Sequence, residues 1–178
     1  NALRLPLERS LDLWTYLMSP LGTQPAVNDA GRSRFDARIL VDGGQAFSRP
    51  DMRWVSRNLL GASIPDAGDP PDRTSVDFRP SGFAVMRQDW TRDSPYMVIN
   101  YGEYSGGHSH ADILSFELFA YGEALAVDAG IGTSYDDPLH TTWYRTSRAH
   151  NMLLFDDADL DRRAAVGEKP IWRHLEGL

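Results

Sequence analysis

The sequence contains no cysteine among its 178 residues. Disulfides, thiolate zinc sites and cysteine nucleophiles are therefore all excluded. The absence of cysteine does not decide the compartment, because reducing and oxidising locations both tolerate it. The sequence also lacks any run of the roughly 18 consecutive apolar residues that a membrane helix requires, so we expect no membrane-spanning segment.

Positive charge is in the minority, with 18 Lys and Arg against 25 Asp and Glu and a net charge of −7. This balance argues against nucleic-acid binding through a broad basic face. It remains compatible with an anionic polysaccharide, because a local basic cleft can lie on an acidic molecule. The chain starts without Met or a signal-peptide pattern and ends in sequence typical of a folded region, so we expect a fragment of a longer protein.

The first third of the chain has the apolar periodicity of helices. It predicts three of them, over residues 7–18, 32–47 and 50–61. Pro50 suits a first helical turn, and Gly61 suits a helix end. Residues 19–31 are predicted to form a loop, and the Pro- and Asp-rich residues 62–75 are predicted to form a boundary.

The sequence after residue 75 alternates β-branched or aromatic residues with polar ones, which is typical of antiparallel strands. Residues 113–130 read as a hairpin turning at Gly122-Glu123, with Leu114, Phe116 and Leu118 on one apolar face. A further strand is predicted within residues 151–161. Together these patterns predict an α+β fold, with helices first and an antiparallel β domain second.

The hairpin is preceded by GGHSHAD, which carries two histidines. In an extended segment His108 and His110 point the same way, with their Cα atoms about 7 Å apart. Asp112 follows directly, Asp128 ends the hairpin, and His150 lies further along the chain. Zinc accepts imidazole nitrogens and carboxylate oxygens in a tetrahedron. A metal site is one interpretation; the other is that Asp128 caps the hairpin and His150 makes a local hydrogen bond.

Two blocks bear a family resemblance: GGHSHADILSFELFAYGEALAVDAGIGTSY, residues 106–135, and WYRTSRAHNMLLFDD, residues 143–157. They resemble the signature of heparinase II/III-like polysaccharide lyases. The resemblance implies that residues 1–70 are the last helices of an (α/α) toroid. It implies that residues 71–178 are the N-terminal part of an antiparallel β-sandwich, with the active cleft between the two. Met152 and Asp157 depart from the family pattern, which leaves the substrate open.

The resemblance also implies roles for individual residues. His110, Asp128 and His150 match zinc ligands. His108 matches a catalytic histidine in the cleft, and Tyr135 matches a cleft tyrosine that acts as a base in related alginate lyases. Tyr144 competes with Tyr135 for the latter role. His108, Arg148 and Arg145 are candidates for the positive charge or hydrogen-bond donor that favours a phenolate, and Arg148 is a candidate substrate-binding residue.

Three protein ligands and one open position ordinarily indicate a catalytic zinc. The family resemblance favours a structural Zn²⁺ that holds the loop carrying His108. The implied reaction is β-elimination at a uronic acid of an anionic polysaccharide. Because the toroid residues of the cleft are expected upstream of residue 1, the fragment alone is expected to be inactive.

Two other functions also fit the sequence. One is a non-catalytic carbohydrate-binding sandwich, in which the HSH loop orders a binding face. The other is a cupin-like metal enzyme, because an HxH motif on a strand with a distant carboxylate and histidine also suits a jelly roll. The lyase interpretation predicts a periplasmic or secreted location, an expectation drawn from polymer degradation alone.

Overall fold

The structure is a computed structural model that describes residues 2–102 and 107–154. Three α-helices come first: α1 (Arg4–Leu17), α2 (Ala37–Phe47) and α3 (Pro50–Asn58). Five strands follow: β1 (Val76–Phe78), β2 (Phe83–Arg87), β3 (Tyr96–Asn100), β4 (Ser115–Ala120) and β5 (Glu123–Ala126). Short helical turns are η1 (Arg79–Ser81), η2 (His140–Tyr144) and η3 (Ser147–Ala149). The predicted α+β class is confirmed. Among the described residues, no helix has the length and apolar character needed to cross a bilayer.

The helices lie close to their predicted positions, and the differences have local causes. Helix α2 begins at Ala37, later than predicted, because Asp36 has an extended backbone and its carboxylate accepts a hydrogen bond from the N–H of Arg38. Such a side-chain cap fixes the first turn of a helix. Helix α3 begins at Pro50, as predicted, and ends at Asn58, before Gly61.

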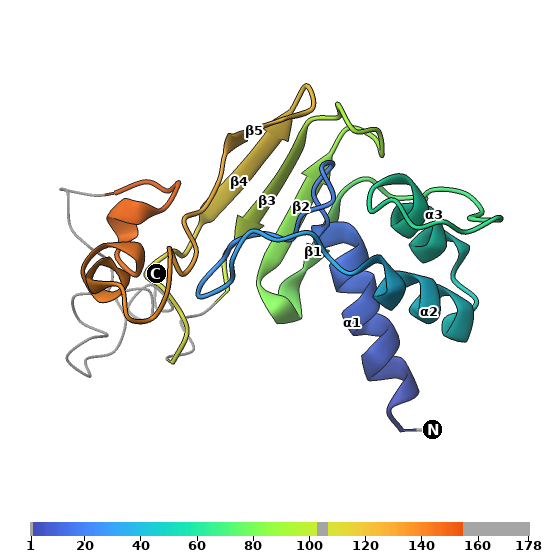
Figure 1. Ribbon diagram of the computed structural model, residues 1–178, viewed down its shortest axis with the longest axis horizontal. Coiled ribbons are helices and arrows are strands. Elements are labelled where there is room, and N and C mark those ends of the chain that lie inside the picture. Colours follow the sequence, from blue (N-terminus) through green and yellow to red (C-terminus); the bar gives the residue numbers. More distant parts are fainter. Residues whose placement is uncertain (1, 103–106, 155–178) are drawn as a thin grey trace, which may run out of the picture.

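The five strands form one antiparallel sheet in the order β1-β2-β3-β4-β5, so each strand pairs with its neighbours in sequence (Figure 1). The β4–β5 turn consists of Tyr121 and Gly122, one residue earlier than predicted, because Ala120 pairs with Glu123. The φ angles of Tyr121 and Gly122 are 58° and 75°. Positive φ at both central residues is what a type I′ hairpin turn requires.

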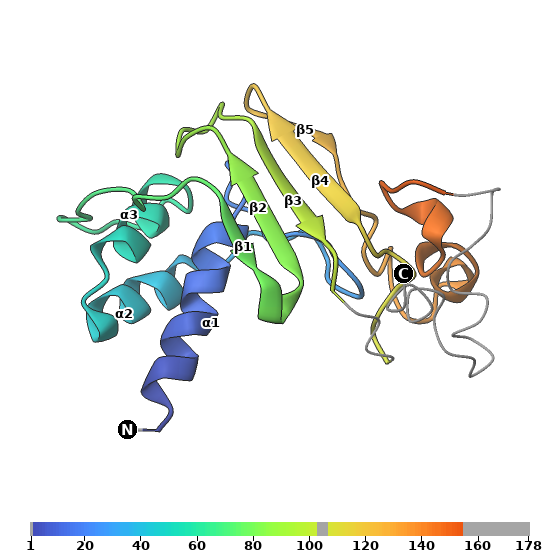
Figure 2. The ribbon, with the colours of Figure 1, turned by 180° about the vertical axis from the view of Figure 1, so that it is seen from behind.

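One face of the sheet packs against the N-terminal helices. Val85, Val98 and Glu117 lie side by side in register on this face and are buried. The apolar face expected from the hairpin is the opposite one, which the helices do not cover (Figure 2). There Phe116 and Leu118 are half-buried, and Leu114, just before β4, is 63% exposed. The alternation was correctly predicted, but the helices select the other face.

Helix α1 is attached to the sheet through its C-terminal carbonyl groups, which have no partner within the helix. The guanidinium of Arg87 on β2 donates to the carbonyl oxygens of Tyr16 and Met18 at 3.0 and 2.6 Å. The hydroxyl of Tyr96 on β3 donates to the carbonyl oxygen of Leu17 at 2.8 Å. The sheet thereby satisfies three consecutive carbonyl groups of the helix end.

The loop between α1 and α2 crosses the sheet from the helices toward the segment that follows β5 (Figure 1). Its course is fixed by Glu117, whose carboxylate accepts hydrogen bonds from the N–H of Ala26 at 2.8 Å and of Asp128 at 3.3 Å. Asn28 and Asp29, which follow Ala26, are thereby brought beside the HSH segment.

The strand predicted within 151–161 does not form in residues 151–154. Asn151 pairs with the sheet: its carbonyl oxygen accepts from the N–H of Phe116 at 3.1 Å, and its side-chain amide donates to the carbonyl of Phe116 at 3.0 Å. Residues 155–161 of this prediction lie outside the described part of the chain.

Candidate active site and metal centre

The HSH segment lies in a turn and an irregular stretch, not in the extended strand assumed from the sequence. The side chain of His108 is 79% exposed, whereas that of His110 is fully buried. The guanidinium of Arg145 donates to the carbonyl oxygens of Gly107 and Ser109, both at 2.8 Å. Arg145 therefore fixes the shape of the loop that exposes His108.

Both histidines contact one carboxylate, that of Asp29 on the α1–α2 loop. Oδ2 of Asp29 lies 2.7 Å from Nδ1 of His108, and Oδ1 lies 2.9 Å from Nε2 of His110. Nε2 of His140 on η2 lies 3.6 Å from the same Oδ1. The sequence interpretation missed Asp29 and His140, because no local pattern links Asp29 to histidines that follow it by 79 residues or more.

The environment of this carboxylate favours its ionised form. Partial burial raises the pKa of Asp29, but the hydrogen bonds from His110 and His108 outweigh burial and hold that pKa below its usual value. Burial lowers the pKa of His110, against the opposing effect of Asp29. The Asp29 side chain is only 7% exposed. Its ionised carboxylate therefore places a fixed negative charge directly against the ring of the exposed His108.

The structure places Tyr135, not Tyr144, against His108. The hydroxyl of Tyr135 lies 3.1 Å from Nδ1 of His108. The ring of Tyr144 packs so closely on Gly132 that a Cβ there would lie 2.2 Å from a ring carbon. Partial desolvation and the charge of Asp29 raise the pKa of Tyr135, so the protonated phenol is the favoured form.

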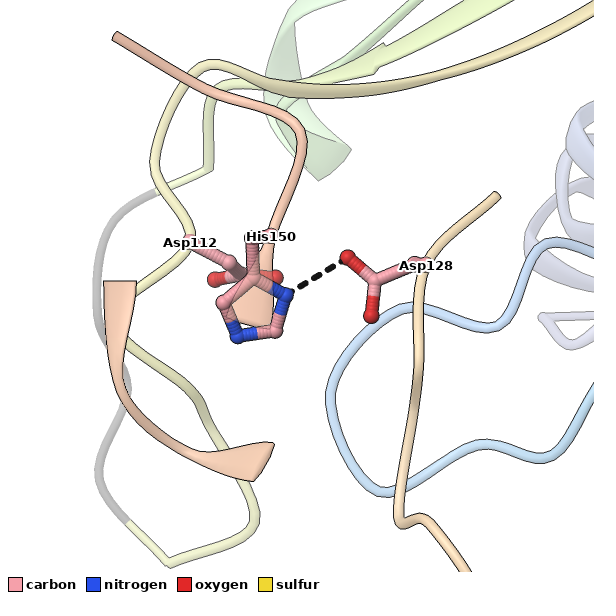
Figure 3. Close-up of side chains that lie close together, drawn as sticks. All are labelled: Asp112, Asp128 and His150. Carbon is pink, nitrogen blue, oxygen red and sulfur yellow. Dashed lines mark hydrogen bonds and ion pairs between the residues drawn. The ribbon is translucent and has the colours of Figure 1, made fainter. Parts of the chain in front are cut away.

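A buried cluster with the composition of a metal site lies behind this exposed pair. Asp112, before β4, Asp128, after β5, and His150, after η3, converge from three segments (Figure 3). Each offers a ligand atom within 4.8 Å of the others, and all three residues are buried. Asp128 Oδ2 lies 2.7 Å from Nδ1 of His150. Oδ2 of Asp112 accepts from the side-chain amide of Asn100 at 2.9 Å.

The charges of the cluster favour a bound cation. Burial, with a smaller contribution from the charge of Asp128, raises the pKa of Asp112 to about 6, against the opposing effect of His150. Burial lowers the pKa of His150, but the hydrogen bond and charge of Asp128 more than compensate, so that pKa is raised. Two carboxylates in a buried site need either protons or a cation. This triad could hold a metal ion.

His110 adjoins the triad without being part of the tight cluster. Its ring centroid lies 5.4 Å from that of His150. Within the described residues, two buried ring nitrogens have no hydrogen-bond partner: Nδ1 of His110 and Nε2 of His150. Buried polar atoms without partners are rare, and an absent ion is one cause of them. The residues present therefore fit a metal with nitrogen and oxygen ligands.

Arg148, the sequence candidate for substrate binding, lies on η3 and is exposed. It is two residues before His150, on the segment that carries this ligand candidate. The expected residues thus divide into an exposed group with His108 and Tyr135, and a buried group with Asp128 and His150.

Comparisons with known proteins bear on the family of this chain. Residues 70–175 match the family described as Heparinase II/III-like, C-terminal. Two relatives named heparin-sulfate lyase, from Bacteroides stercoris and Pedobacter heparinus, are each 29% identical, over 99 and 96 residues. These alignments cover 54% and 52% of this chain but only 15% of each relative, so the chain spans a small part of their length.

Solved structures share the fold. A crystal structure of heparinase III aligns with a TM-score of 0.76 at 20% identity, covering 87% of this chain and 27% of that chain. A heparan sulfate lyase from Pedobacter heparinus aligns with a TM-score of 0.74 at 21% identity, covering 86% of this chain and 24% of that chain.

Proposed function

Because the chain belongs to the heparinase II/III-like family, we propose that it is part of a polysaccharide lyase that cleaves uronic-acid-containing polysaccharides by β-elimination. The proposed substrate class follows from the two relatives named heparin-sulfate lyase. Heparan sulfate is therefore the first glycan to test. Residues 1–70 would contribute helices to one side of the cleft and residues 71–178 would contribute the β domain. Action on such a polymer implies a periplasmic or secreted enzyme.

The observation that carries this proposal is the exposed His108, held by the buried carboxylate of Asp29 with the hydroxyl of Tyr135 at 3.1 Å. A histidine with an orienting carboxylate and a nearby phenol is a set of groups suited to proton transfer. The net charge of −7 does not oppose an anionic substrate, because positive charge lies locally at the site. Arg148 is exposed on η3, and the guanidinium of Arg145 contacts the HSH loop.

The proposed reaction requires two proton transfers and no water. A base removes the C5 proton of the uronic acid, the C5–H electron pair forms the C4=C5 double bond, and the C4–O bond breaks with its electrons leaving on oxygen. The leaving oxygen then takes a proton. We assign proton removal to His108 and proton delivery to Tyr135, in place of the base role expected for this tyrosine, because its raised pKa favours the protonated phenol over the phenolate. Arg148 would offset the charge of the substrate carboxylate.

The proposed metal is Zn²⁺, held by Asp128, His150 and His110, with the carboxylate of Asp112 close enough to take part. Mixed imidazole and carboxylate ligands suit zinc. When bound, the ion would offset the negative charge of the buried carboxylates and hold together the segments that flank His108. A structural role is supported by burial, since the three side chains of the triad are buried while His108 is exposed.

The experiment measures the absorbance of the unsaturated uronate product. The polypeptide that carries this chain with its toroid is expected to generate that product from heparan sulfate, and the 178-residue chain alone is expected to generate little. His108→Ala should lower kcat by about 100-fold or more. Asp42→Asn, a charge change on the exposed face of α2, is the matched control and should leave kcat unchanged.

Saturable polysaccharide binding without any unsaturated product, across heparan sulfate, alginate and chondroitin-type glycans, would contradict the lyase proposal. It would support the carbohydrate-binding alternative instead. A normal rate from the 178-residue chain alone would contradict the expectation that the cleft needs further helices.

A further inference from the structure

Asp29 lies outside residues 70–175, the part of the chain that matches the family, yet its carboxylate contacts two histidines of the site. An ionised carboxylate has no hydrogen to donate and can only accept hydrogen bonds. Its two oxygens lie 2.7 Å from Nδ1 of His108 and 2.9 Å from Nε2 of His110. Each of these ring nitrogens must therefore carry a hydrogen.

This assignment fixes the remaining nitrogen of each neutral ring. A neutral imidazole has one N–H and one lone pair, so a hydrogen on Nδ1 of His108 leaves the lone pair on Nε2. The His108 side chain is 79% exposed. In His110 the lone pair falls on Nδ1, which is buried and has no hydrogen-bond partner among the described residues.

We propose that Asp29 is a positioning residue that selects both tautomers at once, making Nε2 the reacting nitrogen of His108 and Nδ1 the metal-facing nitrogen of His110. The catalytic part of this inference rests on the proposed function, whereas the tautomer assignment does not. Carboxylates that accept the second N–H of a ligating histidine orient its ring in this way. The N-terminal loop would thus complete a site whose other residues come from the β domain.

The loop is built to hold Asp29 in this position. The side-chain oxygen of Asn28 accepts from the N–H of His110 at 3.0 Å. The N–H of Ala26 donates to the buried Glu117 at 2.8 Å. Hydrogen bonds of Ala26 and Asn28 therefore hold the loop against β4 and the HSH segment without help from the Asp29 side chain. Replacement of that side chain alone should leave the loop in place.

The first test is side-chain ¹⁵N NMR of the labelled chain, with the signals of His108 assigned through His108→Gln. The wild type should show His108 with its hydrogen on Nδ1 and His110 with its hydrogen on Nε2. In Asp29→Asn one acceptor oxygen is replaced by an NH₂ donor, so at least one of the two rings should change tautomer. Asp42→Asn should leave both spectra unchanged. A wild-type spectrum with the hydrogen of His108 on Nε2 overturns the proposal without reference to any variant.

The second test uses the polypeptide that carries the chain with its toroid. Asp29→Asn should lower kcat by about 10- to 100-fold with little change in KM, as expected for loss of an orienting partner. Equal kcat values for Asp29→Asn and wild type would overturn the positioning role. If the wild type itself forms no unsaturated product, the proposed function fails, while the NMR result still decides the tautomers.

Discussion

The carboxylate of Glu117, at the centre of β4, accepts a hydrogen bond from the backbone N–H of Ala26, which lies 91 residues earlier in the chain. The same oxygen accepts from the N–H of Asp128 at 3.3 Å. One buried acidic side chain thus joins the loop that carries Asp29 to the segment that carries a proposed metal ligand.

Replacement of Glu117 should separate the role of its oxygen from the role of its charge. Burial raises the pKa of Glu117 to about 7 and so favours its protonated, neutral carboxyl group, which the neutral amide of glutamine resembles. Glu117→Ala leaves two buried N–H groups without an acceptor and should lower the free energy of unfolding by about 3 kcal/mol. Glu117→Gln keeps the acceptor and should lower the free energy of unfolding by about 1 kcal/mol or less. Urea denaturation measures both, and equal losses would show that the charge, not the acceptor, is required.

Arg87 should be one of the most sensitive positions for stability. Its guanidinium lies 3.8 Å from the ring centroid of Trp90 and donates to two carbonyl oxygens at the end of α1. Arg87→Met should lower the free energy of unfolding by about 3 kcal/mol, since it removes both hydrogen bonds and the cation–π contact. Arg79→Met is the matched control, because Arg79 is exposed and pairs with Asp77 at the surface. Its effect should be within about 0.5 kcal/mol. Similar losses for the two variants in denaturant titrations would contradict this account.

Metal analysis should identify the ligands. The purified chain is expected to contain one zinc ion, and His150→Ala and His110→Ala should lose it and lower the Tm. Asp112→Asn should weaken zinc binding by about tenfold or more, because it removes a buried negative charge beside the ion. His140→Gln, which changes another buried histidine that contacts Asp29, should retain the zinc. If His110→Ala retains zinc and Asp112→Asn loses it, the third ligand is Asp112 and not His110.

Tyr121 offers a stabilising substitution at the β4–β5 turn. It has a φ of 58° and the residue is 83% exposed. Asparagine tolerates a positive φ better than tyrosine does, so Tyr121→Asn should raise the free energy of unfolding by about 0.5–1 kcal/mol. Tyr121→Val should lower it, because a β-branched residue is disfavoured there. Thermal melts of both variants measure the difference, and a Tm for Tyr121→Asn at or below the wild-type value would refute the strain assigned to this turn.

Local patterns predicted much of the fold because helix and strand periodicity depend on nearby residues. The predicted first turn of α3 at Pro50 and the hairpin of β4 and β5 are of this kind. The start of α2 was displaced because the Asp36 cap, a single side-chain contact, overrides the apolar pattern. The buried face of β4 could not be predicted from its own alternation, because the packing of helices that precede it decides which face is covered.

The sequence by itself determined the α+β class, the strand order along the chain, the family resemblance and the residues eligible to bind a metal or transfer a proton. Only the tertiary structure decided which of them meet. It brought Asp112 to Asp128 and His150, placed Tyr135 rather than Tyr144 beside His108, and added Asp29 and His140. The physical reason is that side-chain identity is local, whereas a site formed by several loops depends on how the helices pack on the sheet and where the loop after α1 crosses it.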